Sequence, residues 1–187
     1  MAQLVTFSVD GNKRPGALNG DRVLDLQAAG LPSGEYGDLL EIARGGEALL
    51  ARVRSAVADW AAPDFSIDEV KIEAPIQYPP KIIGIGLNYL DHCREAKMDV
   101  PAEPVIFTKY STSVTGPYDD VCWHSDVCQN MDYEVELGVV IGKSAFRVSE
   151  KTAMDYVLGF TVVNDISARD LQLGGAGQWD ICLLYTS

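Results

Sequence analysis

Two glutamates interrupt an apolar run in the second half of the chain, within the segment Met131–Gly142 (MDYEVELGVVIG). Glu134 and Glu136 lie two positions apart, so on a β-strand their side chains point to the same face, roughly 7 Å from each other. At an effective dielectric near 20, two carboxylates at that separation repel each other by about 2–3 kcal/mol. One interpretation is a half-exposed strand whose glutamates face water. The other is that a bound cation removes the repulsion.

A third carboxylate, Asp165, ends the predicted strand of residues 157–165 (VLGFTVVND). If a neighbouring strand brings Asp165 against the two glutamates, the three groups could bind a hard divalent cation, Mg²⁺ or Mn²⁺, which prefers oxygen ligands. Zn²⁺ is not expected, because no histidine or cysteine joins the group. Asp165 is also a good N-cap for a predicted helix over residues 166–173 (ISARDLQL), and this alternative remains open.

The predicted helix after Asp165 adds two polar side chains to the same region. Asp165, Arg169 and Gln172 are spaced i, i+4 and i+7, which would place them on one helical face. The guanidinium of Arg169 is a two-pronged donor suited to the carboxylate of a substrate. From the spacing alone, an ion pair between Arg169 and Asp170 or Asp165 is equally plausible.

A histidine and a glutamate occur close together in the segment Asn88–Glu95 (NYLDHCRE). His92 and Glu95 are spaced i and i+3, so on a helix the carboxylate can orient the imidazole while its other nitrogen accepts a proton from water. The alternative is an ordinary surface pair. The second histidine, His124, lies in a polar loop and is assigned no role.

Composition restricts the classes of protein that the chain can belong to. Its 187 residues suffice for a sizeable core, and its net charge of −12 argues against a nucleic-acid partner. There is no apolar segment of membrane-spanning length and no targeting segment, so neither a membrane partner nor export is expected. The four cysteines follow no zinc or disulfide spacing, which favours reduced thiols in a cytoplasmic protein.

The order of the predicted elements suggests two domains. Residues 1–28 are predicted as short strands with a hairpin turn at Asn19-Gly20, and residues 36–60 as two short helices separated at Gly45-Gly46. Residues 61–80 are predicted to be an extended junction. We therefore expect a small N-terminal α+β domain over residues 1–75, followed by a mainly β domain over residues 76–187 with a strand at 104–110 (PVIFTKY).

Four motifs in the second half resemble those of the fumarylacetoacetate hydrolase superfamily, of the acylpyruvate hydrolase or 2-hydroxyhepta-2,4-diene-1,7-dioate isomerase type. They cover residues from about 80 to 179. The motifs are GLNY at Gly86–Tyr89 followed by His92 and Glu95, FTK at Phe107–Lys109, DYEVEL at Asp132–Leu137, and GFTVVNDISARDLQ at Gly159–Gln172.

The resemblance implies a fold, a set of roles and a reaction. The implied fold is α+β and mainly β, with a mixed β-roll of the fumarylacetoacetase C-terminal type after the N-terminal domain, usually in a homodimer. Glu134, Glu136 and Asp165 would bind Mg²⁺ or Mn²⁺, and His92 with Glu95 would activate a water. Arg169, Gln172, Lys109 and Tyr133 would bind the substrate, a small-molecule 2-oxo or 2,4-dioxo acid. The implied reaction is hydrolytic C–C cleavage of a 2,4-dioxo acid, or decarboxylation or isomerisation of a related 2-oxo acid.

The end of the chain departs from the family pattern. Members of the family continue after Gln178-Trp179 with a lysine and further strands, whereas this chain continues as Asp180–Ser187 (DICLLYTS). The expectation is a C-terminally truncated catalytic domain, with a catalytically inactive fragment as the alternative to an active enzyme.

Overall fold

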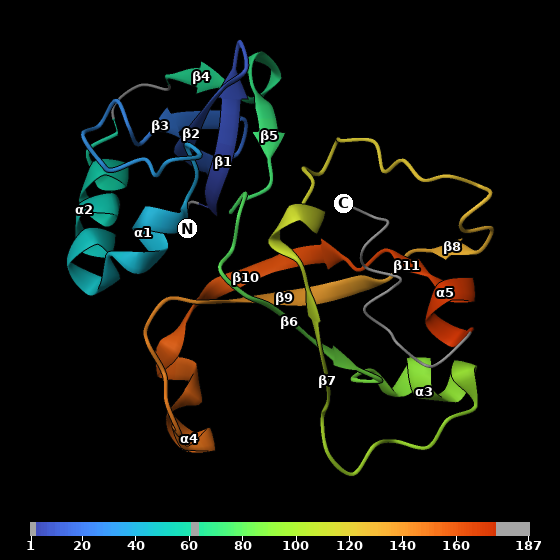
Figure 1. Ribbon diagram of the computed structural model, residues 1–187. Coiled ribbons are helices and arrows are strands. Elements are labelled where there is room, and N and C mark those ends of the chain that lie inside the picture. Colours follow the sequence, from blue (N-terminus) through green and yellow to red (C-terminus); the bar gives the residue numbers. More distant parts are fainter. Residues whose placement is uncertain (1–2, 61–63, 175–187) are drawn as a thin grey trace. The chain divides into compact units, whose positions relative to one another are not determined.

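The computed structural model describes residues 3–60 and 64–174, and it is mixed α/β and mainly sheet (Figure 1). Two compact units share the chain. One contains the residues up to Tyr78 together with Thr115–Asp120 and Val135–Asn164, and the other contains Pro79–Val114, Val121–Glu134 and the segment that begins at Asp165. Among the described residues, no helix has the length and apolar character needed to cross a membrane.

The N-terminal residues form an antiparallel five-stranded sheet in the order β4-β3-β2-β1-β5. Its strands are β1 (Gln3–Val9), β2 (Asn12–Asn19), β3 (Arg22–Asp25), β4 (Phe65–Ser66) and β5 (Lys71–Glu73). The predicted hairpin turn is confirmed, since Asn19 pairs with Arg22 and Gly20 has the positive φ of +66° that favours glycine.

The two predicted helices are also confirmed. They are α1 (Leu40–Arg44) and α2 (Gly46–Ala58), and they are separated where Gly46 adopts a φ of +62°. Their apolar residues pack with the sheet around one core. The buried members of this core are Ala17, Leu24, Leu26, Leu31, Leu39, Ile42 and Val53.

The prediction of an extended junction over residues 61–80 is wrong for its middle part. Phe65 lies in β4 and packs its ring against Phe7, with 5.6 Å between the ring centroids, while β5 pairs with β1. A short 3-10 helix (Ile67–Glu69) connects the two strands. The proline content suggested a linker. Instead, Phe65 in β4 and the short strand β5 complete the two edges of the N-terminal sheet. The predicted domain boundary at residue 75 stays a prediction.

The remaining strands form three antiparallel pairs: β6 with β7, β8 with β11, and β9 with β10. The strands are β6 (Ile82–Gly86), β7 (Val105–Lys109), β8 (Met131–Asp132), β9 (Val135–Ile141), β10 (Val157–Asn164) and β11 (Ser167–Ala168). The helices are α3 (Leu90–Ala96), α4 (Glu150–Ala153) and α5 (Arg169–Leu173), with short 3-10 turns at Ser111–Ser113 and Met154–Tyr156.

Two predicted elements differ from the observed ones. The predicted glutamate strand is divided at residues 133–134, between β8 and β9. The predicted helix at 166–173 begins only at Arg169, because Ser167 and Ala168 pair with β8 as the short strand β11. Asp165 is therefore neither on the helix nor its N-cap. The prediction that Asp165 shares one helical face with Arg169 and Gln172 is wrong. The predicted features of the tail after Trp179 lie outside the described residues.

The pair β6–β7 is packed through a glycine. Gly84 lies opposite Phe107, and a Cβ atom on Gly84 would lie 2.2 Å from the Cζ atom of the Phe107 ring. Phe107 in turn packs against a small cluster with buried Cys128 and Ala168, one residue before α5. Any side chain at position 84 would thus push Phe107 out of this contact.

We expect Gly84→Ala to lower the free energy of unfolding by about 1–3 kcal/mol, since overpacking forces the neighbouring ring to move. Gly159→Ala in β10 is the matched control, because nothing lies within 4 Å of its added Cβ. It should change the stability by less than about 1 kcal/mol. Denaturant unfolding of both variants measures the difference, and equal stabilities would contradict the packing described.

Asp170 fastens α5 to the segment before β8. Its carboxylate accepts a hydrogen bond from the Cys128 thiol at 2.9 Å and one from the backbone N–H of Gln129 at 2.8 Å. These two bonds, with the thiol contribution the larger, lower the pKa of Asp170 below its usual value. In addition, the backbone N–H of Arg169 donates to the Asn130 carbonyl at 2.9 Å.

Because the pKa of Asp170 is lower in the folded chain than in the unfolded one, its ionised form stabilises the fold above the ordinary aspartate pKa, and the stabilisation is lost as pH falls through the lowered value. We therefore expect Asp170→Asn to lower Tm at pH 7, and the difference from the wild type to shrink on acidification toward pH 3. Asp155→Asn, at an exposed position in a 3-10 turn, is the control. A difference in Tm that is independent of pH would contradict this account.

Candidate metal centre

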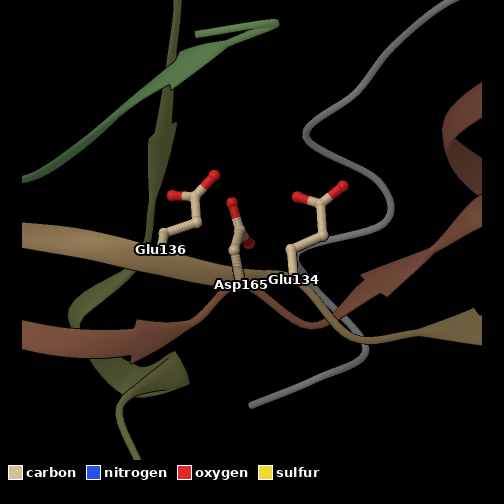
Figure 2. A group of neighbouring side chains, drawn as sticks. All are labelled: Glu134, Glu136 and Asp165. Atoms are coloured by element: carbon tan, nitrogen blue, oxygen red, sulfur yellow. The ribbon is translucent and has the colours of Figure 1, made fainter. Parts of the chain in front are cut away.

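Three carboxylates converge at one end of the β9–β10 hairpin (Figure 2). Glu134 lies in the connection between β8 and β9, Glu136 lies in β9, and Asp165 directly follows β10. One oxygen of each side chain lies within 4.8 Å of one oxygen of the other two. The convergence that the sequence predicts is therefore present, and it arises, as predicted, because a neighbouring strand brings Asp165 beside the glutamates.

The register of the hairpin explains the convergence. Asn164 pairs with Val135, Val163 pairs with Glu136, and the backbone N–H of Asp165 donates to the carbonyl of Glu134 at 2.8 Å. Residues that lie opposite each other in such a ladder hold their Cβ atoms about 5 Å apart. The chain beyond the last pair thus keeps Asp165 beside the glutamates.

Both glutamates are partly withdrawn from water, Glu136 on the less exposed face of β9 and Glu134 just before that strand. Burial alternates along β9, with Glu136 half-buried and Val135 and Leu137 exposed at 70% and 61%. The Glu134 side chain is only 22% exposed. A solvated strand would show the opposite alternation, so the interpretation of Glu134 and Glu136 as a water-facing surface is wrong.

Two cationic side chains neutralise part of the cluster. The Lys109 ammonium pairs with the Asp165 carboxylate, and the Arg169 guanidinium pairs with that of Glu134. Arg169 also donates from Nε to Asp132 Oδ2 at 2.9 Å. The ion pairs predicted as an alternative for Arg169, with Asp170 or Asp165, are replaced by pairs with Glu134 and Asp132.

The environment shifts the ionisation of two of these groups. Burial raises the pKa of Asp165 above its usual value, although Lys109 acts in the opposite direction. Burial also disfavours the charged form of Arg169, but its hydrogen bonds to Glu134 and Asp132 outweigh this effect, and its pKa is raised. At an effective dielectric near 20, carboxylate oxygens 4.8 Å apart repel by about 3 kcal/mol for each pair. The cluster therefore requires positive charge.

The cluster suits a hard divalent cation. All three candidate ligands are carboxylates, the ligand type that Mg²⁺ and Mn²⁺ prefer. Asp165 is 5% exposed, and the close neighbour of its buried Oδ1 atom is the paired Lys109 ammonium. Among the described residues, no hydrogen bond of ordinary geometry reaches this oxygen. A buried carboxylate that lacks hydrogen bonds is stabilised by a cation.

The remaining predicted site residues lie on two helices, α3 and α5, and in the connection between β8 and β9. α3 carries His92, half-buried, and Glu95, exposed, and in the described part of the chain no hydrogen bond joins them. Gln172 lies in α5 and accepts a hydrogen bond from Arg169 at 2.8 Å, while Tyr133 is 73% exposed. The roles of these four residues in catalysis or substrate binding stay predictions.

Asp132 is a site residue that the sequence analysis did not predict. It accepts hydrogen bonds from Arg169 and so helps to orient the guanidinium that pairs with Glu134. The spacing contained a signal for it, because Asp132, Glu134 and Glu136 alternate at i, i+2 and i+4 and would share one face of a continuous strand.

Proteins with similar sequences and structures carry out several related reactions. The chain is 43% identical over 164 residues to the mitochondrial oxaloacetate tautomerase FAHD2A of Bos taurus, an alignment that covers 86% of this chain and 50% of that protein. The chain thus spans about half the length of this relative.

Two solved structures have similar folds. The maleylpyruvate hydrolase of Sphingobium sp. SYK-6, in complex with manganese(II) and pyruvate, matches with a TM-score of 0.71 and 25% identity over 90% of this chain and 60% of that one. A probable 2-hydroxyhepta-2,4-diene-1,7-dioate isomerase from Mycobacterium abscessus matches with a TM-score of 0.70 and 32% identity over 100% of this chain and 59% of that one.

A family model describes the part of the chain that contains the cluster. The fumarylacetoacetate (FAA) hydrolase C-terminal model matches residues 81–181, which is more than half of the chain and includes all three carboxylates and both cations. The motif resemblance, the similar structures and this match agree. The chain belongs to the fumarylacetoacetate hydrolase superfamily.

Proposed function

We propose that the protein is a metal-dependent enzyme that hydrolyses a C–C bond in a 2,4-dioxo acid of the acylpyruvate or fumarylacetoacetate type. The observation that carries the proposal is the group of three carboxylates within 4.8 Å of one another, with Arg169 beside it. The manganese and pyruvate in the similar maleylpyruvate hydrolase support both the type of metal and a 2-oxo acid ligand. We further propose that the enzyme acts as a homodimer in the cytoplasm.

In this proposal Glu134, Glu136 and Asp165 hold Mg²⁺ or Mn²⁺. When bound, the ion stabilises the negative charge that develops on the 2-oxo group of the substrate. Arg169 is the proposed partner of the substrate carboxylate, because a guanidinium matches the geometry of a carboxylate. To bind it, Arg169 would exchange part of its pairing with Glu134 and Asp132 for the substrate. Gln172 and Tyr133 provide further polar contacts with the substrate.

His92 is the proposed general base. Its imidazole accepts a proton from the water that attacks the distal carbonyl, and Glu95, one helical turn later, orients the ring. The protonated imidazole then returns the proton to the leaving carbon when the C–C bond breaks. The products are a carboxylic acid and a pyruvate-type 2-oxo acid, so atoms and charges balance.

A second candidate reaction is tautomerisation of oxaloacetate, and a third is decarboxylation or isomerisation of a related 2-oxo acid. The tautomerase name of a relative that is 43% identical favours it. Tautomerisation also develops negative charge on a 2-oxo group and also requires a base, so the same residues would serve both reactions.

Glu136→Gln should weaken Mn²⁺ and Mg²⁺ binding strongly, because the amide keeps the shape of the side chain but removes its charge from the cluster. Titration calorimetry with each metal measures the change. Glu150→Gln, at an exposed position in the first turn of α4, is the control and should bind as the wild type does. Unchanged affinity in Glu136→Gln would rule out the carboxylate cluster as the metal site.

His92→Ala should lower kcat by roughly a hundredfold or more while leaving Mn²⁺ affinity intact, because a general base is not a ligand. His124→Ala is the matched control. Activity is followed as the loss of 2,4-dioxo acid absorbance and, separately, as the interconversion of keto and enol oxaloacetate. Activity with oxaloacetate alone would favour the tautomerase, and loss of Mn²⁺ binding in His92→Ala would make His92 a ligand.

A further inference from the structure

Two polar contacts hold the ammonium group of Lys109 in place. It is the last residue of β7, and its side chain is 13% exposed. The ammonium pairs with the Asp165 carboxylate and donates a hydrogen bond to the carbonyl oxygen of Ile166 at 3.0 Å. Both acceptors belong to consecutive residues, in the short segment that leads from β10 to β11.

The strand that carries Lys109 is itself anchored. Phe107 and Lys109 point to the same, less exposed face of β7, and Phe107 packs against Cys128 and Ala168. Because Ala168 lies only two residues after Ile166, the phenyl ring and the ammonium hold the same stretch of chain at two points. The base of the lysine side chain therefore has a fixed position relative to Asp165.

We infer that Lys109 is a positioning residue, which fixes the orientation of the Asp165 carboxylate toward the metal and does not bind the substrate. The role rests on the proposed metal site. Lys109 contacts the buried Oδ1 atom of Asp165. In this inference the other carboxylate oxygen, Oδ2, is the one that binds the ion. Arg169 pairs with a second candidate ligand, Glu134, but it also pairs with Asp132.

Lys109 can affect metal affinity in two opposite ways, and the direction in which affinity changes when the lysine is removed distinguishes them. If Lys109 acted only through its charge, its repulsion of the metal would weaken binding, and its removal would tighten binding. If it orients a ligand, its removal leaves the Asp165 carboxylate free to rotate and weakens binding. Partners that orient metal ligands typically contribute 10- to 100-fold to metal affinity. The orienting effect should prevail, because the lysine also holds the backbone at Ile166.

The test compares Mn²⁺ binding by calorimetry in Lys109→Met, Lys109→Arg and the wild-type chain. Lys109→Met should bind Mn²⁺ about 10- to 100-fold more weakly. Lys109→Arg should recover most of the affinity, since its guanidinium can still reach both the carboxylate and the carbonyl. The matched control is Lys71→Met, which removes an exposed ion pair with Asp119 and should bind as the wild type does.

Wild-type or tighter Mn²⁺ binding in Lys109→Met, together with a raised KM for a 2-oxo acid, would overturn the inference and make Lys109 a substrate contact. A wild-type chain that binds no Mn²⁺ would instead refute the proposed metal site, and the role of Lys109 with it. Circular dichroism establishes that each variant is folded. If the methionine variant unfolds, Lys109→Gln serves as the second neutral variant, with the same expected loss.

Discussion

The repulsion among three carboxylates is the constraint on which the rest of this structure depends. Glu134, Glu136 and Asp165 place an oxygen each within 4.8 Å of the others, and two of them are mostly removed from water. Such a group is stable only with positive charge beside it. Lys109 and Arg169 supply positive charge beside Asp165 and Glu134, and Arg169 shares its charge with Asp132. A divalent ion would add the further positive charge that suits such a group of carboxylates.

The secondary structure around the cluster serves to hold these charges in place. The β9–β10 register sets Glu136 and Asp165, and β11 keeps the chain extended just long enough to bring Arg169 to Glu134 at the start of α5. Asp170, the next residue, fastens α5 to Cys128 and Gln129. The short strands β8 and β11 and the five-residue helix α5 would not be stable by themselves. Charged and buried contacts stabilise them here, and the same contacts orient the side chains of the site.

The sequence contained the residues of the site but not the way in which the chain positions them. The i, i+2 spacing of the glutamates and the strand before Asp165 predicted the cluster, because side-chain alternation in strands is a local property. The helix over 166–173 was predicted wrongly, since the local pattern favours a helix and only pairing with β8 makes residues 167–168 a strand. The acidic partners of Lys109 and Arg169 could not be predicted, because they lie 35 or more residues away along the chain and depend on strand pairing.

A crystal of the chain soaked in Mn²⁺ would test the central claim most directly, because the anomalous scattering of the metal locates it without reference to any assumed site. We expect one strong anomalous peak, within about 2.3 Å of oxygens from Glu134, Glu136 and Asp165, with Lys109 still in contact with the other oxygen of Asp165. A peak coordinated by His92, or no peak among the three carboxylates, would show that these carboxylates are not the metal site.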